Sequence, residues 1–135
     1  MTENQLKTLD LENPFLESLG IRLVRWEDGY AEMHLTVVPG LTNRTGRIHG
    51  GVICTLLDSV CGYCGQYSEP GQPKVKAVTL SLTTNFIGNA DDGLIIAKGY
   101  MVRRGRSVYF SRSEVWMNNE ELLATAVGTF KYVKR

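Results

Sequence analysis

Residues 43–58 read Asn-Arg-Thr-Gly-Arg-Ile-His-Gly-Gly-Val-Ile-Cys-Thr-Leu-Leu-Asp and join a polar, glycine-containing loop to a mostly apolar helix. We predict that this helix runs from Gly51 to about Gln66, with Asp58 as the one carboxylate inside it. An acid within an apolar helix is costly unless it is paired or used. This stretch therefore directs both the fold prediction and the search for a site.

The residues that share a helical face with Asp58 are all small. On a wheel of 3.6 residues per turn they are Gly51, Cys54, Thr55, Cys61, Gly62 and Gly65. The other positions are apolar or bulky, so we expect the helix to be buried almost all round. Glycine weakens a helix interior by about 1 kcal/mol relative to alanine. We therefore expect a close neighbour on this face: another backbone, a neighbouring subunit or a ligand.

Strands are predicted on both sides of this helix. The expected elements are a short helix at 13–20, strands at 21–26 and 30–38, the long helix, and strands at 75–86, 94–104, 107–117 and 122–133. Val78, Leu80 and Leu82 alternate with polar residues, which is the period of a half-buried strand. Short turns between most strands favour antiparallel pairing with the helix packed on the sheet. The predicted fold class is α+β.

Composition limits the function classes. The chain has 135 residues, 43% of them hydrophobic, which suits a single domain over 1–135. A net charge of +1 indicates no nucleic-acid partner, although bases outnumber acids over 93–135, which leaves room for a local anion site. No apolar run is long enough to cross a membrane. Met1–Gln5 lacks the start of a signal peptide, and an odd count of three cysteines suits a reducing compartment, so we expect a cytoplasmic protein.

Four positions around the helix start and middle are candidate catalytic residues. Asp58 is a candidate general base or nucleophile, because a partly desolvated carboxylate suits proton transfer; the alternative is a buried acid with a structural partner. Gly50 and Gly51 begin the helix, where unpaired N–H groups and the dipole can stabilise an oxyanion. The alternative for this pair is a turn shaped only by chain geometry. His49 and Asn43, taken singly, are typical of loop and turn residues.

A basic turn and a cysteine pair need separate interpretations. Residues 103–107 read Arg-Arg-Gly-Arg-Ser between two predicted strands. Guanidinium groups suit phosphates, but charge alone favours a solvated hairpin turn. Cys61 and Cys64 form a C-x-x-C inside the helix, without a second pair or a histidine cluster, so we interpret them as packing residues. No metal and no cofactor is expected.

Taken together, Asn43, His49-Gly50-Gly51 and Asp58 resemble the hotdog-fold acyl-CoA thioesterases of the phenylacetate-pathway type, in the 4-hydroxybenzoyl-CoA thioesterase superfamily. The resemblance covers most of the chain and includes the Asn-Pro-Phe-Leu opening at 13–16 and the late Arg-Gly-Arg turn. It implies a hotdog fold, in which a curved antiparallel sheet of five to six strands wraps a long central helix.

The resemblance also implies an activity and an assembly. The expected reaction is hydrolysis of an acyl- or aryl-CoA thioester to the free acid and coenzyme A. The expected assembly is a homodimer at least, with a homotetramer favoured, and active sites at the subunit interface. Gly50 N–H of one subunit would polarise the carbonyl, and Asp58 of the other would activate water or attack directly. Asn43 and His49 would orient water and substrate, and Gly51 would contact the substrate.

Further site residues are implied by the same resemblance. The family often places a helper hydroxyl early in the strand after the helix. An ungapped count from the motif reaches Lys76 or Ala77, which have no hydroxyl, so Thr79 is the nearest candidate. Arg103, Arg106 and Ser107 would contact the coenzyme A nucleotide. Two other functions stay open, a non-catalytic acyl-CoA-binding hotdog module and a hotdog enoyl-CoA hydratase. The acyl group, the choice between general-base and nucleophilic chemistry, and the choice between dimer and tetramer also stay open.

Overall fold

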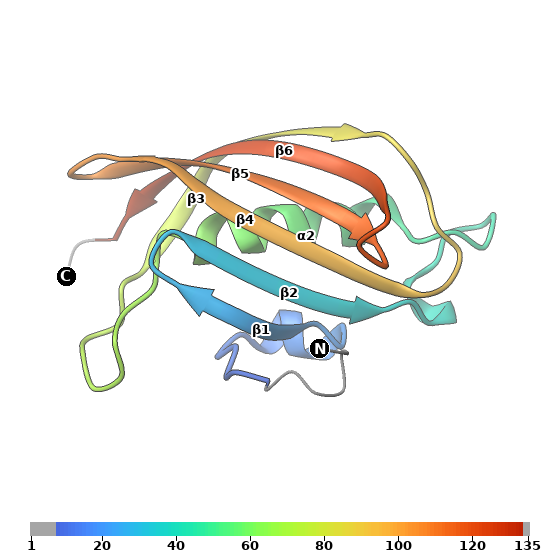
Figure 1. Cartoon of the computed structure of the whole chain (residues 1–135), viewed down its shortest axis with the longest axis horizontal. Helices are drawn as coiled ribbons and strands as arrows, with labels where there is room; N and C mark the ends of the chain where they lie inside the picture. Colours follow the sequence, from blue (N-terminus) through green and yellow to red (C-terminus); the bar gives the residue numbers. More distant parts are fainter. Residues whose placement is uncertain (1–7, 134–135) are drawn as a thin grey trace.

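The computed structural model describes residues 8–133, so the expectation drawn from Met1–Gln5 lies outside the described part. In chain order the elements are α1 (Pro14–Ser18), β1 (Arg22–Glu27), β2 (Tyr30–Thr36), η2 (Pro39–Leu41), α2 (Gly50–Tyr63), β3 (Ala77–Phe86), β4 (Leu94–Arg104), β5 (Val108–Met117) and β6 (Glu121–Tyr132). The predicted order is confirmed, with the short 3-10 turn η2 added. Six strands form one antiparallel sheet that curves around α2, which confirms the α+β hotdog architecture (Figure 1).

The strand order is β1-β2-β4-β5-β6-β3. Strands joined by short turns are neighbours, but β2 pairs with β4, and β3 crosses to the far edge to pair with β6. Within the described chain β3 therefore pairs along one side only. Val78 and Leu80 on this edge strand are 51% and 56% exposed. A long apolar edge strand is a template on which another chain can pair.

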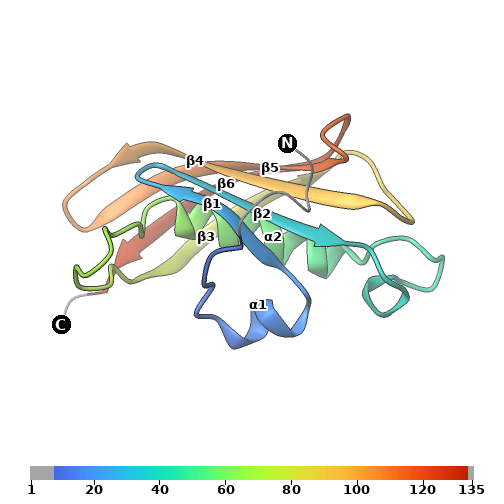
Figure 2. The same cartoon turned by 60° about the horizontal axis from the view of Figure 1, so that its bottom comes forward.

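α2 lies against the concave face of the sheet, and Leu16 of α1 belongs to the same core (Figure 2). The buried residues of α2 are Ile53, Leu56, Leu57, Val60, Cys61 and Gly62. Gly99 on β4 allows this close packing, because a Cβ at that position would collide with the Val60 carbonyl. The glycine thus sets how closely the helix and the sheet approach each other.

The expectation that α2 is buried almost all round is wrong. Gly51, Cys54, Thr55, Asp58 and Ser59 are half-exposed or exposed, so one face of the helix is open in the described chain. The sheet covers the opposite face, and it cannot also cover this one because it lies on one side of the helix.

The glycines near the end of α2 have neighbours from the chain's own sheet. A Cβ at Gly65 would clash with the Tyr109 ring, and one at Gly62 would lie 3.4 Å from the Phe130 ring. At Gly65 the close neighbour is thus the Tyr109 ring of the chain's own sheet, whereas a neighbouring subunit or a ligand on the Asp58 face stays a prediction.

Side chains of the sheet bind the carbonyls of the C-terminal half of α2. The donors are hydroxyls of β5 and the indole of β1: Ser113 to Leu57, Ser111 to Cys61, Tyr109 to Gly62 and Trp26 to Tyr63. The helix ends at Tyr63, three residues before the predicted end, and these donors add to the main-chain hydrogen bonds that the Gly62 and Tyr63 carbonyls accept from Gly65 and Gln66.

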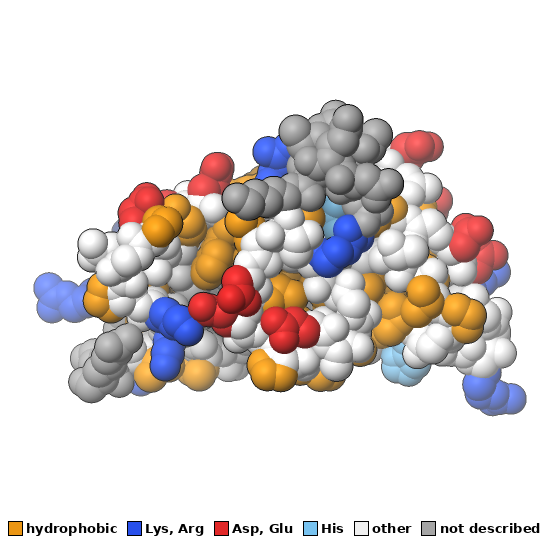
Figure 3. Space-filling model, turned by 90° about the horizontal axis from the view of Figure 1, so that it is seen from below, with side chains coloured by type: hydrophobic (Ala, Val, Ile, Leu, Met, Phe, Trp, Pro, Cys, Tyr) orange, Lys and Arg blue, Asp and Glu red, His pale blue; other side chains and the backbone are white. Residues whose placement is uncertain are grey.

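Two surface properties bear on partners. In the described part of the chain, no helix is both long and apolar enough to cross a bilayer. Figure 3 shows acidic and basic side chains next to each other on one face, with no broad basic area among the residues described there. A broad basic area is what a duplex nucleic acid would require.

Candidate active site

Asp58 lies in the middle of α2, on its open face. Thr79 on β3 donates a hydrogen bond from Oγ1 to Asp58 Oδ1 at 2.7 Å, so the expected helper hydroxyl lies beside the expected acid. No lysine or arginine among residues 8–133 forms an ion pair with Asp58. The carboxylate is thus held by a neutral hydroxyl, and its catalytic role stays a prediction.

Thr79 faces the helix, and a β-bulge follows it directly. The register between β3 and β6 shifts between Thr79 and Ser81, which makes Leu80 an extra residue. Thr79 stands opposite Phe130, a buried residue on the helix side of the sheet. The simple alternation predicted from Val78 to Leu82 is therefore interrupted, because a bulge moves the following residues to the other face.

The two glycines at the start of α2 have different roles. His49 is the N-cap residue, and its Nδ1 accepts a hydrogen bond from Gly51 N–H at 2.8 Å. A Cβ at position 51 would lie 3.0 Å from that nitrogen, so glycine there permits the cap. A Cβ at Gly50 would meet only the Phe86 ring at 3.6 Å, an ordinary contact. Geometry therefore requires Gly51, whereas Gly50 is free of this constraint.

Gly50 keeps an unused main-chain donor. No residue of the described chain accepts a hydrogen bond from Gly50 N–H, whereas Gly51 N–H is engaged by His49. This donor sits at the positive end of a 14-residue helix, the position where an oxyanion is stabilised. Because His49 Nδ1 accepts, the neutral ring carries its proton on Nε2 and can donate outward. Substrate contact by Gly51 stays a prediction.

Gly50 and Asp58 do not meet within one chain. They are eight residues apart on α2 (58 minus 50), which corresponds to about 12 Å along the helix axis. One thioester carbonyl cannot contact both groups across that separation. A site that uses both requires a second copy of the chain.

Asn43 organises the loop before α2. Its Oδ1 accepts from Thr45 N–H at 3.0 Å, from Thr45 Oγ1 at 2.7 Å and from Arg47 N–H at 3.2 Å. The turn role that the sequence suggested for Asn43 alone is thus present. Only its amide N–H groups remain for water or substrate, so its catalytic role stays a prediction.

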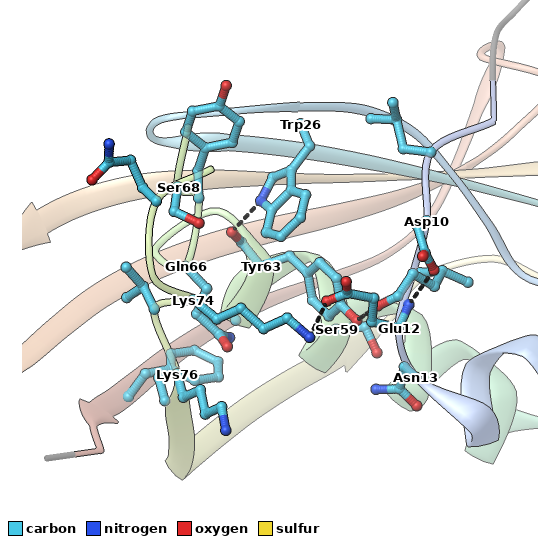
Figure 4. A pocket seen from close by; sticks show the side chains of 18 of the residues that line it. Asp10, Glu12, Asn13, Trp26, Ser59, Tyr63, Gln66, Ser68, Lys74 and Lys76 are labelled. Carbon is cyan, nitrogen blue, oxygen red and sulfur yellow. Dashed lines mark hydrogen bonds and ion pairs between the residues drawn. The ribbon is translucent and has the colours of Figure 1, made fainter. Parts of the chain in front are cut away.

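A cleft of about 1010 Å³ opens beside Asp58 and Thr79. Figure 4 shows side chains from other parts of its lining, among them Ser59, Lys74 and Glu12. Its walls are the open face of α2, residues 9–13 and the loop at 66–76. Lys74 pairs with Glu12 at 2.8 Å and joins the two outer walls. The volume is in the range of small-molecule sites. Sequence reasoning missed this cleft because its walls come from segments far apart in the chain.

The structure separates the three arginines of the basic turn. Arg104 pairs with Asp28 at 2.7 Å and donates from Nε to Tyr132 Oη at 3.0 Å. Arg103 and Arg106 are exposed and have no acidic partner among the described residues. These two, which the sequence selected, are the arginines available to an anion. A nucleotide contact by Ser107 stays a prediction.

The cysteines of the C-x-x-C pair are free thiols buried in the core. Burial raises the pKa of Cys61 and raises that of Cys64 to about 12, so both stay protonated. Over residues 8–133 no three His, Cys, Asp or Glu side chains gather to hold a metal ion. The packing role expected for the cysteines fits this environment.

Comparison with known proteins identifies the family. The family model described as thioesterase superfamily matches residues 45–124, which span the helix start, Asp58 and most of the sheet. This chain belongs to the thioesterase superfamily. Within this superfamily, the chain is 25% identical over 131 residues to a "putative esterase" of Saccharolobus solfataricus, covering 96% of this chain and 85% of that protein.

Solved structures of related proteins share the fold. A conserved protein of Pseudomonas aeruginosa is 26% identical, with a TM-score of 0.79 over 98% of this chain and 100% of that one. The PaaI protein of E. coli, from the phenylacetic acid degradation operon, has a TM-score of 0.80 at 19% identity, over 90% of this chain and 86% of that one. The latter match shows the fold alone. Superfamily membership and the relatives' names support hydrolase activity on thioesters or esters.

Proposed function

We propose that this thioesterase-superfamily protein hydrolyses an acyl- or aryl-CoA thioester to the free acid and coenzyme A. Asp58 of one subunit acts as general base or nucleophile, and Gly50 N–H of its partner polarises the carbonyl. The observation that carries the proposal is a carboxylate held by Thr79, without a cationic partner in the described chain, at the edge of an open cleft.

The edge strand β3 supports the assembly that this site needs. Its exposed apolar side chains and unpaired backbone favour antiparallel pairing with β3 of a second copy. A twofold axis there would place two α2 helices side by side in opposite directions. The start of one helix would then approach the middle of the other, which brings Gly50 towards the partner's carboxylate. The proposed minimal unit is this dimer, and a tetramer would combine two of them.

The proposed chemistry uses each group once. As general base, Asp58 takes a proton from water while the water oxygen bonds to the thioester carbon. The negative charge that develops on the carbonyl oxygen is stabilised by Gly50 N–H and the helix dipole. Collapse breaks the carbon–sulfur bond, and the proton returns to the sulfur of coenzyme A. In the nucleophilic variant the carboxylate attacks the thioester carbon, the carbon–sulfur bond breaks and coenzyme A leaves as its thiolate; water then hydrolyses the mixed anhydride, which releases the acid and restores the Asp58 carboxylate.

Complementation between subunits tests the proposal. Asp58→Asn removes the acid, and Gly50→Pro removes the N–H donor. Each homodimer should be inactive, but a mixed dimer contains one site with both native groups. After denaturation and refolding of an equal mixture, about a quarter of native activity should return, since half the dimers are mixed with one intact site of two. No recovery, in mixed dimers verified by mass, would contradict a shared site.

The same preparation separates the competing functions. Thiol release from a panel of aromatic and aliphatic acyl-CoAs reports hydrolysis and ranks the acyl groups. Hydration of an enoyl-CoA without thiol release would indicate a hydratase. Tight binding of an acyl-CoA without product over hours would indicate a binding module.

A further inference from the structure

We infer that Arg104, held by Asp28, is a positioning residue that fixes the β4–β5 turn so that Arg103 and Arg106 can contact the phosphates of coenzyme A. The inference rests on the proposed function and adds to it a residue pair outside the catalytic groups. Arg104 and Asp28 themselves stay with each other and do not bind the ligand.

The contacts of Arg104 are those of a structural anchor. Its Nη2 and Nη1 donate to the two carboxylate oxygens of Asp28 at 2.7 and 3.4 Å, and its Nε donates to Tyr132 Oη at 3.0 Å. Tyr132 Oη in turn donates to the Gly65 carbonyl at 3.1 Å, just beyond the end of α2. A guanidinium bound on both edges in this way has one orientation.

The turn that carries Asp28 is itself fixed. Gly29 N–H donates to the Cys64 carbonyl at 3.0 Å, and Met101 N–H donates to the Gly29 carbonyl at 3.0 Å. The β1–β2 turn is therefore attached both to the end of α2 and to β4. Figure 1 shows the β1–β2 turn, the β4–β5 turn and the end of β6 at the same end of the molecule. The position of Asp28 is thus fixed, and its ion pair with Arg104 attaches the basic turn to it.

The three arginines of the basic turn also differ in whether an acidic side chain neutralises their charge. The Arg104 guanidinium holds the pKa of the Asp28 carboxyl below its ordinary value, so the acid is ionised and cancels the charge of Arg104. Arg103 and Arg106 keep their charge without an acidic partner in the described chain. Two free guanidiniums on one short turn suit phosphate groups, provided that the turn is held still.

The test compares two substrates with one acyl group. Asp28→Asn and Arg104→Gln are assayed with the acyl-CoA and with the same acyl group on pantetheine, which lacks the nucleotide. We expect KM for the acyl-CoA to rise about fivefold to tenfold, the size of one lost charge-assisted contact, with kcat unchanged. KM for the acyl-pantetheine should not change. Arg112→Gln, an exposed arginine paired with Glu114 on β5, is the matched control and should leave both values unchanged.

Specific outcomes would overturn the inference. If Arg104 bound phosphate itself, Asp28→Asn would release it and lower KM for the acyl-CoA. If the turn were only a folding element, KM would rise equally for both substrates. The charge-reversed pair, Asp28→Arg with Arg104→Asp, should restore most of the native KM, and failure to do so in a folded protein would also count against it.

The wild-type protein shows whether the proposed function has failed instead. Absence of acyl-CoA turnover would overturn the proposed function and this inference together. Equal KM for both substrates in the wild type would remove the nucleotide contact on which the inference rests. A native preference for the acyl-CoA that Asp28→Asn leaves intact would overturn the inference alone.

Discussion

The backbone polar groups at the two ends of α2 differ in the hydrogen-bond partners that the chain gives them. In the C-terminal half, the carbonyls of Leu57, Cys61 and Gly62 accept extra hydrogen bonds from β5, and Asp58 accepts one from Thr79. At the N-terminal end, the cap from His49 satisfies Gly51 N–H, but Gly50 N–H has no acceptor in the described chain. One end is therefore complete within the chain, and the other presents a donor without a partner.

This difference separates the two halves of the proposed site. The carboxylate accepts its hydrogen bond from Thr79 of its own sheet. The free donor becomes useful only when an acceptor reaches it from outside the chain. The first N–H groups of any helix lack intrahelical partners, and the half-exposed one at Gly50 is therefore open to a ligand or to water.

The strongest disruption should come from the acid. Asp58→Asn keeps the shape of the side chain and an acceptor for Thr79, so we expect a folded protein with kcat lowered by about 10²-fold to 10⁴-fold. Thiol release measures the loss. Ser59→Ala is the control, because the Ser59 hydroxyl donates only to the Thr55 carbonyl of the same helix. Near-native turnover by Asp58→Asn would show that the acid is structural.

The donor end can be tested without disturbing the fold. Gly50→Pro removes one N–H at the first helical position, where proline is well tolerated. His49 before it is extended, with φ −67° and ψ 136°, as a residue preceding proline should be. We expect kcat to fall about 10²-fold, as for the loss of one oxyanion donor.

Gly50→Ala is the matched control for the donor end. It adds a Cβ that the Phe86 ring accommodates, and it keeps the N–H. Its kcat should stay near the native value in the same assay. Equal loss of activity in both variants would mean that space rather than the N–H donor matters at this position.

A smaller effect is expected at the hydroxyl that holds the acid. Thr79→Val keeps the shape and removes the hydrogen bond to Asp58, so kcat should fall about tenfold, the equivalent of about 1.4 kcal/mol. Thr79→Ser should keep most of the activity because it keeps the hydroxyl. Thr83→Val on the same strand serves as the control for β3. A native kcat in the Thr79→Val variant would show that the Thr79 hydroxyl has no helper role.

The smallest effect concerns stability and its pH dependence. The pKa of Asp28 lies below its ordinary value in the folded chain, so its pair with Arg104 stabilises the fold above the unfolded pKa and loses this effect as pH falls through the folded pKa. The pair is exposed and screened, so Asp28→Asn should lower the free energy of unfolding by less than about 1 kcal/mol at neutral pH. Urea unfolding should show this difference disappearing in acid. A difference that persists unchanged in acid would contradict the assignment.

Local patterns predicted much of the molecule. The apolar period predicted α2, and turn residues predicted the strands, with ends that differ from the structure by a few residues at most. The spacing of Gly50 and Asp58 predicted a donor at the start of one helix and an acid in its middle, whereas the cap formed by His49 was not predicted. Gly50 lies at the start of α2 and Asp58 lies in its middle. Such features depend on neighbours within a turn or two, which is why a sequence can reveal them.

Other features could not be read locally. The bulge at Leu80 interrupts the alternation of β3, so that both Thr79 before it and Leu82 after it stand opposite buried positions of β6. Arg104 pairs with Asp28, 76 positions away, so three arginines that look alike in sequence have two different environments. The cleft beside Asp58 likewise depends on loops that the chain brings together from distant positions.

By itself, the sequence determined which residues could form a helix start, a lone acid and a basic turn, because these depend on short-range spacing and residue chemistry. Only the tertiary structure decided that β3 crosses to the sheet edge, that Thr79 holds the acid, and that Gly50 and Asp58 stand about 12 Å apart along one helix. The physical reason is that strand order, register and distance arise from long-range packing, which no local pattern encodes.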